Sequence, residues 1–112
     1  MKTQQALKAL ASLAQDTRLA IYRVLVQQGP GGLSAGAIAR RLNLPAATLS
    51  FHIKELAGAG MVKPRQEGRF IYYAANYDRM NGLLGYLTEN CCQGEGCASE
   101  STLPAKPRRK NA

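Results

Sequence analysis

The spacing of apolar residues along the chain predicts a series of helices. Apolar side chains recur at three- and four-residue intervals over residues 3–13, from an N-cap at Asp16 to Gly29, and from an N-cap at Ser34 to Leu42. This spacing places them on one face of an α-helix. Two more helices are expected over residues 46–57 and 77–88. The apolar residues that show this spacing on the first and last helices are Ala6, Leu7, Leu10 and Leu13, and Met80, Leu83, Leu84 and Leu87.

A sharp turn separates the third and fourth predicted helices. Asn43-Leu44-Pro45 interrupts the pattern, because Asn tolerates the left-handed conformation and Pro enters a helix only in its first turn. Two short helices joined by a three-residue turn are typical of a helix-turn-helix. The expected buried stripe of the second helix consists of Leu49, Ile53 and Leu56.

Two strands are predicted to follow this helix pair. Residues 61–65 and 70–74 have the composition of strands and are joined by Gln66-Glu67-Gly68-Arg69. The expected fold is therefore mainly α with a β-hairpin wing, which is a winged helix-turn-helix. Residues 1–90 would form this single domain. Apolar content then falls, so residues 91–112 are expected to form a flexible C-terminal tail that begins with a cysteine cluster.

The length and the charge of the chain exclude some classes of function and favour others. A chain of 112 residues is long enough for one domain, and 46% hydrophobic residues allow a packed core. No apolar run is long enough for a membrane span and the start does not resemble a signal peptide, so a cytoplasmic protein without a membrane partner is expected. The net charge of +8, half of it carried by the four cations of residues 104–112, favours a nucleic-acid partner.

The second helix of the pair has an outward face suited to a DNA groove. With Leu49 at the centre of the buried face, a rotation of about 100° per residue turns Phe51 and Lys54 outward. Thr48 and Ser50 lie on the flanks, where their hydroxyls could bond base edges or phosphates, and Phe51 could touch a thymine methyl. The alternative is an ordinary solvated face. His52 falls near the buried edge, so it is expected to be a packed histidine and is retained only as a candidate DNA contact.

Five cations outside that helix are candidate phosphate or minor-groove contacts. They are Arg40 and Arg41 in the first helix of the pair, and Lys63, Arg65 and Arg69 in the hairpin. The alternative for the hairpin is a charged tip that only keeps it soluble. An enzyme is not expected, because one histidine and few acids leave no catalytic constellation.

Three blocks of the sequence resemble the ArsR/SmtB family of metal- and metalloid-responsive repressors. They are LAQDTRLAIYRVL (13–25), AIARRLNLPAATLSFHIKELAGAGMV (37–62) and RQEGRFIYYA (65–74). The resemblance implies a homodimer paired through its first and last helices, which binds a palindromic double-stranded operator without a cofactor and leaves it when an inducer binds. Pro45 departs from the Ser or Thr cap common in the family, and Ala46 and Ala47 replace polar residues. Base readout would therefore depend more on Thr48, Ser50 and Phe51.

The resemblance leaves one place for the inducer. One family site uses cysteines in the first helix of the pair, but residues 34–43 contain none; another needs histidine on the last helix, but the only histidine is His52. Cys91, Cys92 and Cys97 remain, and similar cysteines beyond the last helix occur in arsenic-responsive members. Three sulfurs form a soft ligand set. They suit trivalent arsenic or antimony, whose lone pair fills the fourth direction, better than structural zinc, which takes four ligands.

Two other functions stay open. The same cysteines could form a thiol-redox switch on a DNA-binding repressor. The negative end of the preceding helix, together with Glu89 and Glu95, disfavours the reactive thiolate that such a switch needs. A protein that coats DNA without any inducer is the remaining alternative.

Overall fold

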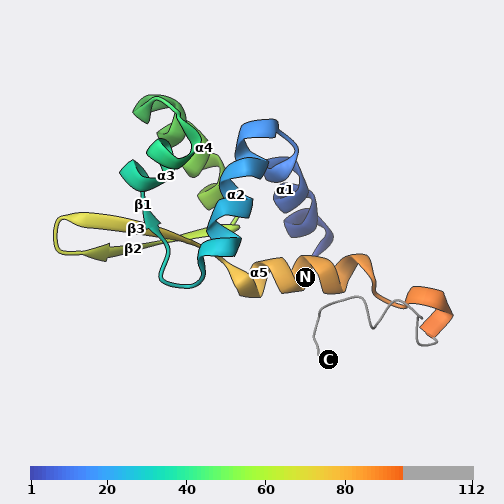
Figure 1. The fold of residues 1–112 in the computed structure, drawn as a ribbon. Coiled ribbons are helices and arrows are strands. Elements are labelled where there is room, and N and C mark those ends of the chain that lie inside the picture. Colours follow the sequence, from blue (N-terminus) through green and yellow to red (C-terminus); the bar gives the residue numbers. More distant parts are fainter. Residues whose placement is uncertain (95–112) are drawn as a thin grey trace.

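The structure is a computed structural model that describes residues 1–94, and it confirms the winged helix-turn-helix (Figure 1). In this part of the chain, no helix has the length and apolar character needed to cross a membrane. The elements in chain order are α1 (Thr3–Leu13), α2 (Asp16–Gln28), β1 (Leu33–Ser34), α3 (Ala35–Leu42), α4 (Ala46–Gly58), β2 (Val62–Glu67), β3 (Phe70–Ala75), α5 (Tyr77–Leu87) and the 3-10 turn η1 (Cys91–Gly94).

The three strands form an antiparallel sheet in the order β1-β3-β2. The β2–β3 hairpin projects from the helices as the wing (Figure 1). Its pairing continues to Glu67 opposite Phe70, so the connecting turn is Gly68-Arg69 and not the four residues expected. Gly68 has a φ of 61°, which glycine adopts without strain, and this allows the tight turn. The sequence did not predict β1, in which Leu33 pairs with Tyr73.

Local signals set the ends of the helices. The Ser34 hydroxyl caps α3 by accepting from the Ala37 amide at 3.2 Å, and Asn43 ends it with a left-handed φ of 55°, both as predicted. The predicted cap at Asp16 is wrong. Gln15 caps α2, because its side-chain oxygen accepts from the Arg18 amide at 2.9 Å, and Asp16 is the first helical residue. A carboxylate there still favours the positive end of the helix.

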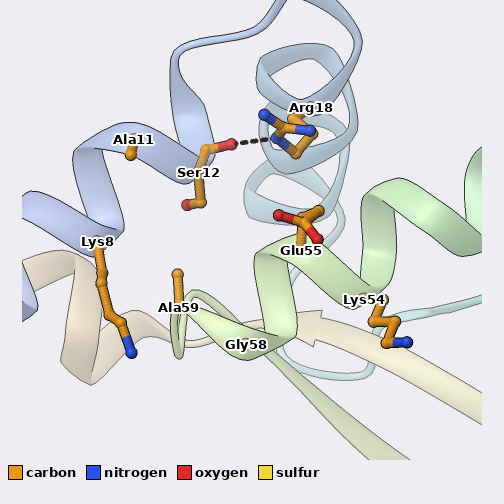
Figure 2. A pocket seen from close by; sticks show the side chains of 8 residues that line it. All are labelled: Lys8, Ala11, Ser12, Arg18, Lys54, Glu55, Gly58 and Ala59. Atoms are coloured by element: carbon orange, nitrogen blue, oxygen red, sulfur yellow. Dashed lines mark hydrogen bonds between the residues drawn. The ribbon is translucent and has the colours of Figure 1, made fainter.

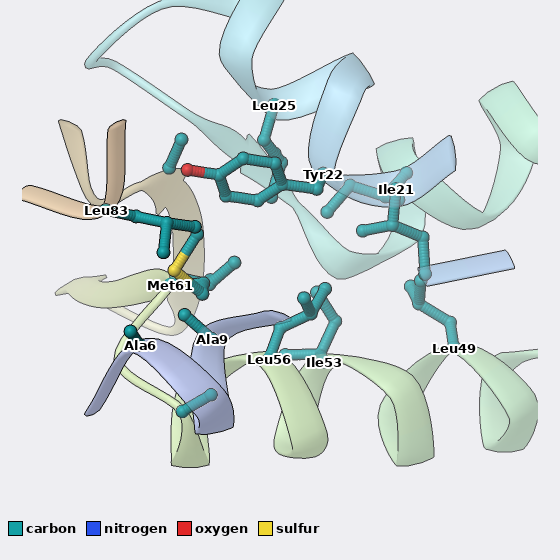
Figure 3. Packing of buried hydrophobic residues seen from close by; sticks show 14 residues of the cluster. Ala6, Ala9, Ile21, Tyr22, Leu25, Leu49, Ile53, Leu56, Met61 and Leu83 are labelled. Carbon is teal, nitrogen blue, oxygen red and sulfur yellow. The ribbon is translucent and has the colours of Figure 1, made fainter. Parts of the chain in front are cut away.

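The core lies where α1, α2, α4 and α5 meet (Figure 3). The stripe of Leu49, Ile53 and Leu56 is buried as predicted. The first and last helices bury only part of their apolar residues: α1 buries Ala6, Ala9 and Ser12, and α5 buries Leu83. Leu7 is 60% exposed and Leu84 is 55% exposed, and Leu10 and Leu87 are exposed as well. The small residues of α1 let it pack closely, which turns its leucines outward.

One buried polar group in this core finds no hydrogen-bond partner among the described residues, the hydroxyl of Tyr22. The neighbouring Tyr77 differs, because its hydroxyl donates to the Val26 carbonyl at 2.9 Å. Burial, and to a lesser degree the charge of Tyr77, raises the pKa of Tyr22 to about 12. The folded protein therefore holds this phenol in its neutral form above the pH at which an unfolded chain would ionise it.

We expect Tyr22→Phe to leave stability at neutral pH unchanged or raise it by about 1 kcal/mol, because it removes an unsatisfied buried hydroxyl. The wild type should lose stability as the pH rises from 10 to about 12, where only the unfolded state ionises Tyr22. The variant should lack that part of the loss. Urea unfolding at pH 8 and pH 11 measures both effects, and an equal alkaline loss in the two proteins would contradict the assignment to Tyr22.

Candidate nucleic-acid interface and cysteine pair

The outward face of α4 consists of the side chains expected there. Thr48, Ser50, Phe51 and Lys54 are all exposed, and Phe51 is 57% exposed. The Phe51 ring meets the His52 ring edge-on, with centroids 5.3 Å apart. An exposed phenylalanine close to two hydroxyl-bearing residues gives this face both apolar and hydrogen-bonding capacity, which is what base edges in a major groove require.

His52 turns to the other side of α4 and connects it to α2. It is only 8% exposed, and its Nδ1 lies 3.3 Å from Nη1 of Arg18, which as a guanidinium nitrogen can only donate. Nε of Arg18 donates in turn to the Ser12 carbonyl at 2.8 Å. This agrees with the packed histidine that the helical spacing predicts, and it keeps the imidazole away from the outward face.

Beside this link, residues of α1, α2 and α4 line an open hollow of about 550 Å³ (Figure 2). Lys8, Arg18 and Lys54 line it together with one carboxylate, Glu55. This hollow could not be predicted from the sequence, because its walls come from three helices whose packing cannot be read from spacing. The Arg18 guanidinium already contacts the Ser12 carbonyl and the His52 ring. Lys8 and Lys54 are therefore the two lining cations that could bind another molecule in this hollow.

The wing separates its three cations. Arg69 lies in the turn, whereas Lys63 pairs opposite Ala74 near the base and lines a hollow with Asp78 and Arg79 of α5. Arg65 lies between them and has partners of its own: Nε is 3.5 Å from Oε2 of Glu67, and the guanidinium stands 5.2 Å from the centre of the Tyr72 ring.

The first two cysteines of the predicted cluster lie directly beyond α5. Their Sγ atoms are 3.6 Å apart, and the Cys91 amide donates to the Thr88 carbonyl at 3.0 Å, which connects η1 to the end of α5. Cys97, the third predicted ligand, lies outside the described residues. Within residues 1–94, no three His, Cys, Asp or Glu side chains gather closely enough to hold a metal ion. The described part thus supplies two sulfurs of the expected three.

Comparison with known proteins agrees with the fold. A family model described as a helix-turn-helix domain matches residues 13–65. The chain is 32% identical over 99 residues to the arsenical resistance operon repressor of Bacillus subtilis, covering 85% of this chain and 88% of that one. It is 30% identical over 80 residues to the nodulation protein NolR of Rhizobium meliloti, covering 71% of this chain but only 63% of NolR.

Solved structures with a similar fold also include transcriptional regulators and DNA-binding domains. An ArsR-like transcriptional regulator from Rhodococcus sp. RHA1 superposes with a TM-score of 0.71 at 25% identity, covering 81% of this chain and 83% of that one. A homodimeric winged helix-turn-helix DNA-binding domain, Mb0332 from Mycobacterium bovis, superposes with a TM-score of 0.62 at 26% identity, covering 84% and 87%. The fold and the exposed α4 face define a winged helix-turn-helix transcriptional regulator. More specifically, the chain belongs to the ArsR family.

Proposed function

We propose that this protein is a DNA-binding repressor that leaves its operator when trivalent arsenic or antimony binds Cys91, Cys92 and Cys97. The observation that carries the proposal is the pair of Sγ atoms 3.6 Å apart at the end of α5. Metal–sulfur bonds of about 2.3 Å allow a single ion to bind two sulfurs at that separation. The similarity to an arsenical resistance operon repressor supports the same inducer.

The ligand set explains the choice of ion. Cys97 follows the pair in the sequence, and we propose that it supplies the third sulfur. Three sulfurs and a lone pair complete the coordination of As(III) or Sb(III). The thiols release protons when they bind the ion, so the apparent affinity should rise with pH.

The proposed active form is a homodimer paired through α1 and α5. These helices already touch each other, with the Thr3 and Tyr86 hydroxyls 2.5 Å apart, and both leave leucines exposed to solvent. Mb0332 of Mycobacterium bovis, which has the same fold, is homodimeric. Two paired chains would present two α4 helices to half-sites of a palindromic operator about 34 Å apart.

The DNA contacts proposed for each subunit come from α4, α3 and the wing. They are Thr48, Ser50, Phe51 and Lys54 for the bases and nearby phosphates, and Arg40, Arg41, Lys63, Arg65 and Arg69 for the backbone. The cysteines lie at the end of a helix that would form the dimer interface. Gathering three sulfurs around one ion would therefore repack α5 and change the spacing of the two α4 helices. A coupling of about 1–3 kcal/mol is enough to lower operator occupancy substantially.

A gel-shift titration with arsenite tests this function. We expect arsenite to release operator DNA from the wild type but not from the Cys91→Ser/Cys92→Ser/Cys97→Ser variant, because serine cannot supply the soft sulfur ligand. Without arsenite the two proteins should bind DNA equally. Release of the triple variant would refute the cysteine site, and binding of random DNA as tight as operator DNA would favour a coating protein.

The adjacent sulfurs also suit a thiol-redox switch, and two measurements separate it from the proposal. Release by peroxide without arsenite, reversed by a reductant, would favour the redox switch. X-ray absorption on the arsenite-loaded protein should count three sulfur neighbours around arsenic, and a count of two would exclude Cys97 or one of the pair.

A further inference from the structure

Another hollow, of about 420 Å³, lies between the start of α3 and the wing. It brings together two arginines that are 29 positions apart in the sequence, Arg40 from α3 and Arg69 from the β2–β3 turn. Arg40 folds back along its own helix, with Nη1 only 3.3 Å from where a Cβ on Gly36 would lie. A side chain at position 36 would crowd the guanidinium, so the small residue there helps to keep it over the hollow.

Neither guanidinium is neutralised by the described part of the protein. Within residues 1–94 the single ion pair joins Arg65 to Glu67, and no carboxylate is among the residues that line this hollow. Two like charges that share one hollow repel each other, so an anion between them would lower the energy of both. Arginine also binds phosphate oxygens through two parallel hydrogen bonds, which suits it to this role.

Apart from Ser34, the residues that line the rest of the hollow are mostly apolar, and the hollow is open to solvent. Phe70, which is 61% exposed, lines it together with Ile71 and Tyr73 of β3. Ala35, Ile71 and Tyr73 also line a neighbouring hollow of about 380 Å³ that contains Ser50 and Lys54 of α4. The two hollows therefore form one groove beneath the wing, which runs from the arginine pair to the outward face of α4. Its shared lining is largely apolar, with Arg40 and Arg69 at one end and Lys54 at the other.

We infer that this groove receives one strand of the operator, with Arg40 and Arg69 of each subunit holding the same backbone phosphate. The inference rests on the proposed DNA binding and gives it a specific partner, a single phosphodiester clamped between α3 and the wing. The apolar wall formed by Phe70 and Ile71 suits the deoxyribose that adjoins the phosphate. The clamp would fix the wing relative to α4, so it would set the register of the base contacts without reading sequence.

Single methylphosphonate linkages, which remove one backbone charge at a time, test the clamp. The probe is a selected operator duplex with one such linkage, moved along each half-site. We expect one position per half-site at which the neutral linkage weakens wild-type binding about tenfold, the loss typical of a charge-assisted hydrogen bond. At that position the linkage should weaken Arg40→Ala and Arg69→Ala less than it weakens the wild type, because one arginine still holds the phosphate, and it should have no effect on the Arg40→Ala/Arg69→Ala variant. Arg41→Ala is the matched control, because Arg41 is on the same helix but does not line the hollow, and it should keep the full sensitivity.

The outcomes separate the clamp from the proposed function. If the two variants lose sensitivity at different positions, or if only one of them loses it, the arginines bind different phosphates and the clamp is refuted while DNA binding stands. If the wild type selects no duplex, the proposed function itself fails. Both arginines are exposed, so their removal should leave the thermal unfolding midpoint unchanged, and this checks that the variants are folded.

Discussion

Glutamate at both Leu84 and Leu87 should convert the protein to a monomer and weaken operator binding at least a hundredfold. Both side chains are exposed on α5 and would be buried against a second copy in the proposed dimer. Each pair of subunits would then bury four carboxylates without partners, which costs several kcal/mol for each isolated charge. Two linked half-site contacts bind about 10²–10⁴ times more tightly than one, so the monomer should lose that factor. Sedimentation measures the mass, and a gel shift measures the affinity.

The matched control is Leu19→Glu. Leu19 is 45% exposed on α2, so this change adds the same charge at an exposed leucine outside the proposed interface. It should leave both the mass and the operator affinity unchanged. If the Leu84→Glu/Leu87→Glu protein remains dimeric, α5 does not form the dimer interface. The proposed coupling between the cysteines and α4 through that interface would then be wrong as well.

These leucines also show what apolar spacing can and cannot predict. The spacing correctly predicted helices at both ends of the domain, but it did not show which of their apolar residues enter the core and which stay exposed, as Leu7, Leu10, Leu84 and Leu87 do. A repeat of apolar residues marks any surface that leaves water, whether it packs within one chain or against another. The distinction depends on the close approach of α1 through Ala6 and Ala9, which a single helix pattern does not contain.

Most features set by neighbouring residues were predicted, although the cap of α2 was placed at Asp16 and not at Gln15. Several features set by tertiary contacts were not predicted. The Ser34 cap and the left-handed Asn43 need only local backbone geometry, and both were predicted. The strand β1 and the hollow shared by Arg40 and Arg69 exist only because the wing folds back beside α3, so no local pattern reveals them. The adjacency of Cys91 and Cys92 made their closeness predictable.

Gly32→Ala should destabilise the domain severely, by about 3 kcal/mol or more. Gly32 has a φ of +76°, which L residues rarely adopt, and a Cβ there would collide with the carbonyl oxygen of Tyr73 and lie 2.9 Å from its carbonyl carbon. The obstacle is the backbone of β3, so it cannot move aside as a flexible side chain would. Relief requires β1 to separate from β3, which would detach the start of α3 from the wing. Urea unfolding measures the loss.

Substitutions at two nearby glycines separate the two causes of this destabilisation, which are the backbone strain and the clash with β3. Gly31 has no positive φ, and a Cβ at this position would have no atom within 4 Å, so Gly31→Ala should leave stability unchanged or raise it slightly by reducing the entropy of the unfolded chain. Gly29 has a φ of +103° but the same open space, so Gly29→Ala should cost only the backbone strain, about 1–3 kcal/mol. The loss of stability on substitution by alanine should therefore be smallest at Gly31, larger at Gly29 and largest at Gly32. Equal losses at Gly29 and Gly32 would mean that contact with β3 adds nothing, and that α3 and the wing are not held together at this point.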